Sequence, residues 1–149
     1  VAEGILQLAK KTNTKVVLPT DFVVTDDAHQ PTYTATVPLG EIPNDLMGVD
    51  IGPKTVQLFV EELSPAATIL FNGPMGIFEV PAFNKGTKEL YALAGTLKNA
   101  YKVAAGGDTA AAVNRLGFGD RVSHVSTGGG ASLEFFEGKM LPGVEPFLL

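Results

Sequence analysis

A glycine triplet near the end of the chain has the sequence setting of an anion-binding turn. Gly128-Gly129-Gly130 follows the apolar strand candidate Val122–Val125, and a helical stretch begins directly after the glycines. Glycine allows a sharp turn and the close approach of a ligand, and the first helical N–H groups have no intrahelical partners. The helix dipole also favours negative charge at this end. The pattern therefore predicts a phosphate site.

Two more strand candidates end in glycine turns. Tyr101–Ala105 precedes Gly106-Gly107-Asp108-Thr109, and Thr68–Phe71 precedes Asn72-Gly73-Pro74-Met75-Gly76. Asp108 is distinctive, because a carboxylate beside phosphates would be repelled unless a hard cation such as Mg²⁺ lay between them. An aspartate that caps the start of the helix is the alternative, and the two roles are compatible. The second turn is thus typical of a nucleotide–metal site.

The segments that position these turns are predicted to alternate between helix and strand. Apolar residues recur at helical spacing in Val1–Ala9, in Pro53–Leu63 and in Phe83–Leu97, and Pro53 suits a first helical turn. Val16–Leu18 is uniformly apolar, which is typical of a buried strand. This alternation predicts an α/β fold with a mostly parallel sheet and helices on both faces, a Rossmann-like three-layer arrangement.

Strand-to-helix turns of a parallel sheet all lie at its carboxyl edge. The turns at Gly73, Gly106 and Gly128 should therefore share one rim, where one extended phosphate-bearing ligand could touch all three. The sequence contains neither the P-loop motif nor the dinucleotide-binding glycine fingerprint, and it lacks the serine elbow of hydrolases.

A polar, proline-bearing stretch from Thr25 to Pro43 interrupts the alternation. We expect it to leave the main sheet, with a short edge strand at residues 34–37. Asp26, Asp27 and His29 could be proposed as metal ligands, but their spacing fixes no geometry, so a solvated loop is the better interpretation.

Length and composition restrict the class of protein. The 149 residues are 45% hydrophobic and 18% charged, which suits one globular domain, residues 1–149. The formal charge of −5, with 11 scattered basic residues, argues against a nucleic-acid partner. The chain has no cysteine and no apolar run of the roughly 18 residues that a membrane span needs. It starts at Val1 without methionine, and we expect it to be a piece of a longer protein.

Five blocks of the sequence resemble phosphoglycerate kinases, in the family's order and spacing. They are Met47–Pro53, Asn72–Glu79, Phe83–Thr87, Gly106–Thr109 and Val122–Gly143. The resemblance covers essentially the whole chain, but only the carboxyl-terminal, nucleotide-binding part of the longer, two-lobed family proteins. Ala105 stands where family members often have glycine, and the motif that follows it is intact.

The resemblance implies a role for each motif. The adenosine pocket would include Gly48, Asn72, Gly73 and Pro74, and Glu79 would bind the ribose hydroxyls. The nucleotide phosphates would be held by Gly106, Gly107 and Thr109, with Asp108 on Mg²⁺. The phosphoryl group in transfer would face Thr127, Gly128, Gly129 and Gly130. The simpler alternatives are that Gly48 and Gly73 are only turns and that Glu79 is a solvated carboxylate.

The reaction that the resemblance implies is reversible phosphoryl transfer from 1,3-bisphosphoglycerate to ADP, which gives 3-phosphoglycerate and ATP in cytoplasmic glycolysis. The phosphoglycerate pocket and the cationic groups around the phosphoryl group would lie in an amino-terminal lobe that this sequence lacks. The extreme carboxyl-terminal segment is expected to pack toward that lobe, and the full-length protein to be a monomer. This chain alone is expected to bind nucleotide without transferring phosphate. A non-catalytic nucleotide-binding or interaction module of the same fold is the alternative.

Overall fold

A parallel three-stranded sheet in the order β4-β5-β6 forms the centre of the computed structural model, which describes residues 1–148. The strands are β4 Thr68–Phe71, β5 Tyr101–Ala105 and β6 His124–Ser126. Leu70 lies opposite Val103, and Val103 lies opposite His124. The predicted α/β fold with a parallel sheet is confirmed, and residue 149, the last of the predicted domain, lies outside the described residues.

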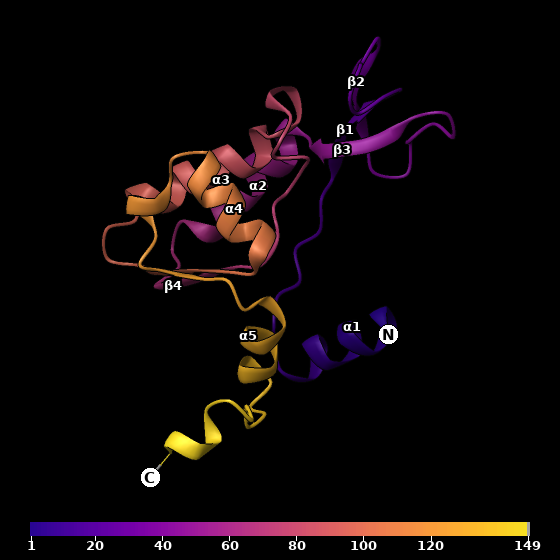
Figure 1. Ribbon diagram of the computed structural model, residues 1–149. Helices are drawn as coiled ribbons and strands as arrows, with labels where there is room; N and C mark the ends of the chain where they lie inside the picture. Colours follow the sequence, from indigo (N-terminus) through magenta and orange to yellow (C-terminus); the bar gives the residue numbers. More distant parts are fainter. Residues whose placement is uncertain (149) are drawn as a thin grey trace.

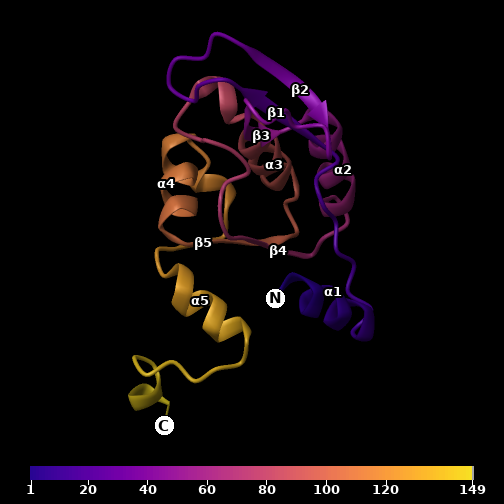
Figure 2. The ribbon, with the colours of Figure 1, turned by 90° about the vertical axis from the view of Figure 1, so that its right-hand side faces the viewer.

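Helices lie on both sides of this sheet. Figure 2 shows α2, α3 and α4 on one side of β4 and β5, with α1 and α5 on the opposite side. Their bounds are α1 Ala2–Lys11, α2 Pro53–Leu63, α3 Lys85–Thr96, α4 Gly107–Arg115 and α5 Gly129–Phe136. Short 3₁₀ turns span Pro81–Phe83, Gly119–Arg121 and Glu145–Phe147. Pro53 is at the first turn of α2, as predicted, whereas α3 begins two residues after Phe83.

The hydrophobic core lies between the sheet and the helices α2, α3 and α4. Phe71 of β4 meets Tyr91 of α3 edge to face, with ring centroids 4.8 Å apart, and Tyr91 also contacts Phe118. Alternate residues of each strand face this core, because side chains along a strand point to opposite faces. The face toward α1 and α5 is more open, since Tyr101 is 56% exposed and Leu70 is 39% exposed.

A second, antiparallel sheet stands apart from the first (Figure 1). Its order is β2-β1-β3, with β1 Asp21–Thr25, β2 Thr34–Pro38 and β3 Met47–Ile51. The predicted excursion and its edge strand are confirmed by β2. Sequence patterning does not predict β3, because glycine and aspartate inside that segment are uncommon in strands.

The prediction of a buried strand at Val16–Leu18 is wrong. Val16 is 42% exposed and Leu18 is 60% exposed, and within residues 1–148 this segment belongs to neither sheet. Lys15 and Val17 line one side of a cavity of about 420 Å³, and β4 lines another side. A strand needs a neighbour to satisfy its backbone groups, and an apolar sequence alone does not supply one.

Asp26 organises the loop between β1 and β2. Its carboxylate accepts hydrogen bonds from the backbone N–H groups of Asp27, Thr32 and Tyr33. In the described part of the chain, no group of three or more histidine or acidic residues could hold a metal ion. No helix of residues 1–148 has the length and apolar character needed to cross a membrane.

Candidate functional site

The three glycine turns meet at the carboxyl ends of β4, β5 and β6. The Asn72 side-chain amide donates to the carbonyl of Ala105 over 3.1 Å, and the Gly106 N–H donates to the carbonyl of Ser126 over 2.9 Å. A Cβ added to Gly129 would lie 3.1 Å from the Gly106 Cα. The predicted juxtaposition of the turns is therefore present, and we call residues 72–76, 106–109 and 127–130 the rim.

Gly106 fixes the shape of the middle turn. It precedes α4 as the N-cap with φ of +107°, a backbone conformation that residues with a Cβ rarely adopt. The next three residues form the first turn of α4, and their N–H groups have no intrahelical acceptor. Gly107 and Asp108 are exposed, and a Cβ on Gly107 would meet nothing within 4 Å, so the start of α4 is open to solvent on this side.

The Thr109 side chain is buried rather than exposed to the space above the rim. The residue is only 1% exposed, and its Oγ1 accepts a hydrogen bond from the Gly73 N–H over 2.7 Å. The hydroxyl thus ties the turn after β4 to the start of α4. The expected contact of Thr109 with a nucleotide phosphate stays a prediction.

Asp108 lies in the first turn of α4 with an exposed side chain. The capping alternative is not observed, since the cap residue is Gly106 and no side-chain hydrogen bond caps the helix. Within residues 1–148 the Asp108 carboxylate has neither a hydrogen bond nor an ion pair, so both of its oxygens are available. A single carboxylate fits Mg²⁺, because this ion is commonly held by one or two carboxylates together with phosphates and water.

The third turn leads into α5 with Gly128 as the N-cap. Thr127, Gly128 and Gly130 are exposed, and a Cβ on Gly130 would meet nothing within 4 Å. The amino end of α5 is therefore open to solvent beside Gly106. This is the arrangement expected of an anion site.

The loop of residues 72–79 is held from several elements. Beyond its bonds to Ala105 and Thr109, it contacts β3, α3 and α4. The hydrogen bonds are Met75 N–H to Thr87 Oγ1 at 2.9 Å, Ile77 N–H to Val49 O at 3.0 Å, Asn84 Nδ2 to Phe78 O at 3.2 Å and Arg115 Nη2 to Glu79 O at 3.1 Å. Gly48 adjoins Val49, and both Gly48 and Glu79 are exposed. The sequence analysis placed Asn84 and Thr87 in the block Phe83–Thr87 but assigned no bond to them or to Arg115, because local sequence does not show which backbone group a side chain meets.

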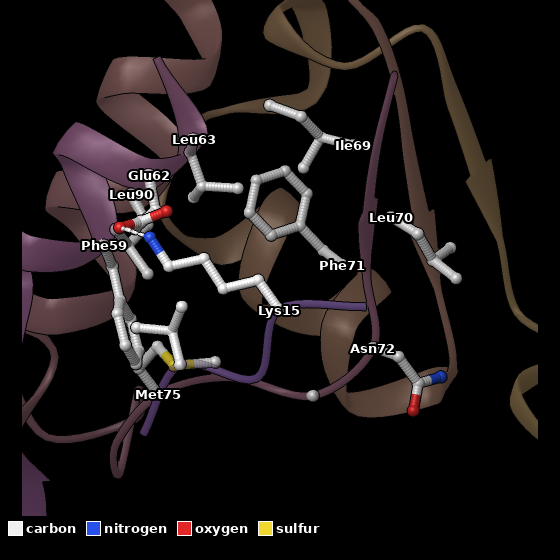
Figure 3. A pocket seen from close by; sticks show the side chains of 12 residues that line it. Lys15, Phe59, Glu62, Leu63, Ile69, Leu70, Phe71, Asn72, Met75 and Leu90 are labelled. Atoms are coloured by element: carbon white, nitrogen blue, oxygen red, sulfur yellow. Dashed lines mark hydrogen bonds and ion pairs between the residues drawn. The ribbon is translucent and has the colours of Figure 1, made fainter. Parts of the chain in front are cut away.

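An apolar cavity adjoins the rim at Asn72 and Gly73. Figure 3 shows Ile69 and Phe71 of β4 pointing into it toward Leu63 of α2, whereas the Asn72 amide points away. Lys15 forms an ion pair with Glu62 beside this cavity. The cavity lies between β4, α2 and the segment that contains Val17, and Asn72, Gly73 and Met75 of the rim line its edge.

Comparison with known proteins identifies the family. The family model described as phosphoglycerate kinase matches residues 1–139. The chain belongs to the phosphoglycerate kinase family. It is 46% identical over 144 residues to the phosphoglycerate kinase of Dictyoglomus turgidum and 50% identical over 147 residues to that of Thermosipho africanus. These alignments cover 97% of the chain but only 36% and 37% of the two relatives.

Solved phosphoglycerate kinases share the fold. The Coxiella burnetii enzyme superposes with a TM-score of 0.87 at 35% identity, and the Pyrococcus horikoshii enzyme with a TM-score of 0.74 at 30% identity. Each match covers 97% of the chain and 37% of the solved protein. The chain therefore spans little more than a third of the length of its relatives.

Proposed function

We propose that this chain is the nucleotide-binding part of a glycolytic phosphoglycerate kinase. It would bind Mg-ADP or Mg-ATP for reversible phosphoryl transfer with 1,3-bisphosphoglycerate, whose site would lie in an amino-terminal lobe beyond this chain. The observation that carries the proposal is the rim, where three glycine turns at the ends of parallel strands adjoin one another. Family membership supports it independently.

The backbone amides of the rim are proposed to bind the phosphates. Residues Gly106, Gly107 and Thr109 would hold the nucleotide phosphates, and residues 127–130 would face the phosphoryl group in transfer. Amide dipoles fixed before the reaction can stabilise charge that spreads over the phosphoryl oxygens, which is most of what phosphoryl transfer requires of a protein. Two helix N-termini, those of α4 and α5, face this space.

The adenosine would lie against the loop of residues 72–79. Asn72, Gly73, Pro74 and Gly48 are proposed to shape its pocket, and Glu79 is proposed to accept hydrogen bonds from the ribose hydroxyls. The bond from Arg115 to the Glu79 carbonyl holds the backbone of this residue and leaves its exposed carboxylate free for that role.

Asp108 is the residue proposed to hold Mg²⁺. When bound, the ion would neutralise charge on the nucleotide phosphates. The carboxylate would otherwise repel the phosphates, so we expect Asp108→Asn to remove most of the effect of Mg²⁺ on ADP affinity. Calorimetric titration with ADP, with and without Mg²⁺, measures this, and we expect the Kd of Mg-ADP to rise about tenfold.

Asp120→Asn is the matched control, because Asp120 is also exposed but lies in the 3₁₀ turn Gly119–Arg121, away from the rim. It should leave the Kd unchanged. Folded wild-type chain that gives no heat and no thermal stabilisation with Mg-ADP would overturn the proposed function. Measurable kinase turnover by the chain alone would contradict the proposal that the rest of the site lies elsewhere.

A further inference from the structure

Asp50 is a buried carboxylate at the junction between β3, the loop of residues 72–79 and the start of α3. It is 5% exposed, and in the described part of the chain it has no ion-pair partner. Its carboxylate accepts hydrogen bonds from the backbone N–H of Ile51 over 2.8 Å and of Gly86 over 2.9 Å. A buried carboxylate without a cation needs such donors, so the first turn of α3 is bound to it.

Two glycines enclose this carboxylate. A Cβ on Gly76, in the loop, would lie 2.5 Å from the Asp50 Oδ1 and 2.4 Å from the carbonyl oxygen of Phe83. A Cβ on Gly86, in α3, would also lie 2.5 Å from the Asp50 Oδ1. Neither contact is sterically possible, so the loop and the helix can approach Asp50 this closely only because both positions lack a side chain.

The start of α3 in turn holds the loop. Thr87, the residue after Gly86, accepts the Met75 N–H with its Oγ1 and is 2% exposed. On the other side of Asp50, the preceding residue Val49 accepts the Ile77 N–H. The loop is thus fixed on both sides of Gly76 by the two elements that Asp50 joins.

We propose that Asp50 and Thr87 are positioning residues that hold the loop of residues 72–79 in its nucleotide-binding conformation. This inference rests on the proposed function, because the same loop carries Asn72, Gly73, Pro74 and Glu79. Neither residue needs to touch the nucleotide. Loss of the Asp50 charge releases the first turn of α3 and with it the bond from Thr87 to Met75.

The primary test is Asp50→Asn, measured by calorimetric titration with Mg-ADP and by amide hydrogen exchange. We expect the Kd to rise about tenfold and the amides of Met75 and Ile77 to exchange faster. Asp21→Asn is the matched control, because Asp21 is also a buried carboxylate that accepts helix N-terminal amides, those of Lys54 and Thr55 in α2. It should lower stability without changing the Kd or the exchange of the loop.

Thr87→Val tests the anchor if Asp50→Asn does not fold. Valine has the shape of threonine but cannot accept the Met75 N–H, whereas Thr87→Ser keeps an acceptor. We expect a weaker Kd and faster Met75 exchange for Thr87→Val, with near wild-type values for Thr87→Ser.

The outcomes separate this inference from the proposed function. The positioning role alone would be overturned if the wild-type chain binds Mg-ADP and both Asp50→Asn and Thr87→Val keep its Kd and its rate of amide exchange in the loop. An equal loss of affinity in Asp21→Asn would also overturn it, because the effect would then follow general stability. Absence of binding in folded wild-type chain would overturn both.

Discussion

Two buried aspartates of similar geometry have opposite pKa shifts. Burial raises the pKa of Asp21. Hydrogen bonds from the Thr55 hydroxyl and from the Thr55 and Lys54 amides lower it, as does the nearby Lys54 charge, and the resulting pKa lies below 3.8. For Asp50, burial raises the pKa above 3.8, and the bonds from Gly86 and Ile51 offset only part of that rise. The difference follows from the Thr55 hydroxyl and the Lys54 charge, which lower the pKa of Asp21 and have no counterpart at Asp50.

Asp21 should therefore contribute stability that depends on pH. A folded-state pKa below 3.8 means that the contribution is present above pH 3.8 and is lost as the pH falls below it. We expect Asp21→Asn to lower the free energy of unfolding by about 1–3 kcal/mol near neutral pH, because amides of α2 lose their charged acceptor. Urea unfolding of both proteins over a pH series measures the difference, which should shrink in acid. A difference that does not vary with pH would contradict this assignment.

At the scale of elements, the rim depends on turns that allow three strands to end side by side. Gly106 has a positive φ and meets Gly129 at close range, so the β5–α4 turn and the start of α5 fit together as backbone against backbone. Gly107, the next residue, begins a helix, and a Cβ added to it would meet nothing within 4 Å. The backbone conformation therefore requires glycine at position 106 but not at position 107.

This contrast predicts different effects of alanine at the two positions. Gly106→Ala should lower the free energy of unfolding by about 1–3 kcal/mol, because a Cβ is strained at φ of +107°. Gly107→Ala should be neutral or slightly stabilising, because alanine favours a helix and meets nothing within 4 Å. Thermal unfolding of the two variants measures the contrast. Equal effects would show that the positive φ does not determine the requirement for glycine.

At the scale of the whole molecule, apolar side chains are unevenly distributed. They cover the core side of the parallel sheet, but many on the opposite side are exposed, including Leu8 of α1 at 61% and Phe135 of α5 at 63%. Figure 2 shows α1 and α5 on that same side of the sheet. Exposed apolar side chains that gather on one side of a protein favour association with another surface.

The exposed surface should make the isolated chain associate with itself. We expect its weight-average sedimentation coefficient to rise with concentration and to fall in the double variant Leu8→Lys, Phe135→Lys, since charge opposes burial of this surface. The control is Tyr33→Lys, Leu39→Lys, which changes two exposed apolar residues beside the antiparallel sheet. It should associate as the wild type does. A wild-type chain that remains monomeric over the concentration series would rule out this association.

The sequence by itself determined the elements with a strong local signal and the family. The bounds of β5 were predicted as observed, and the helix after Pro53 and the edge strand β2 were predicted closely, because apolar periodicity and proline placement act over a few residues. The glycine turns and their common rim followed from the topology of parallel strands. The roles of individual rim residues in binding nucleotide remain predictions.

Only the tertiary structure decided which partner each group meets. The apolar run Val16–Leu18 predicts a strand, yet pairing requires a neighbour that local sequence does not specify. Likewise, the family resemblance assigns Thr109 to the nucleotide phosphates, and only the fold shows that its hydroxyl is buried and accepts the Gly73 N–H. The Asp50 carboxylate accepts the N–H of Gly86, which is 36 residues away in sequence, and this contact underlies its proposed role in positioning the loop of residues 72–79. Hydrogen bonds between distant segments depend on the whole chain path, and local propensity carries no information about that path.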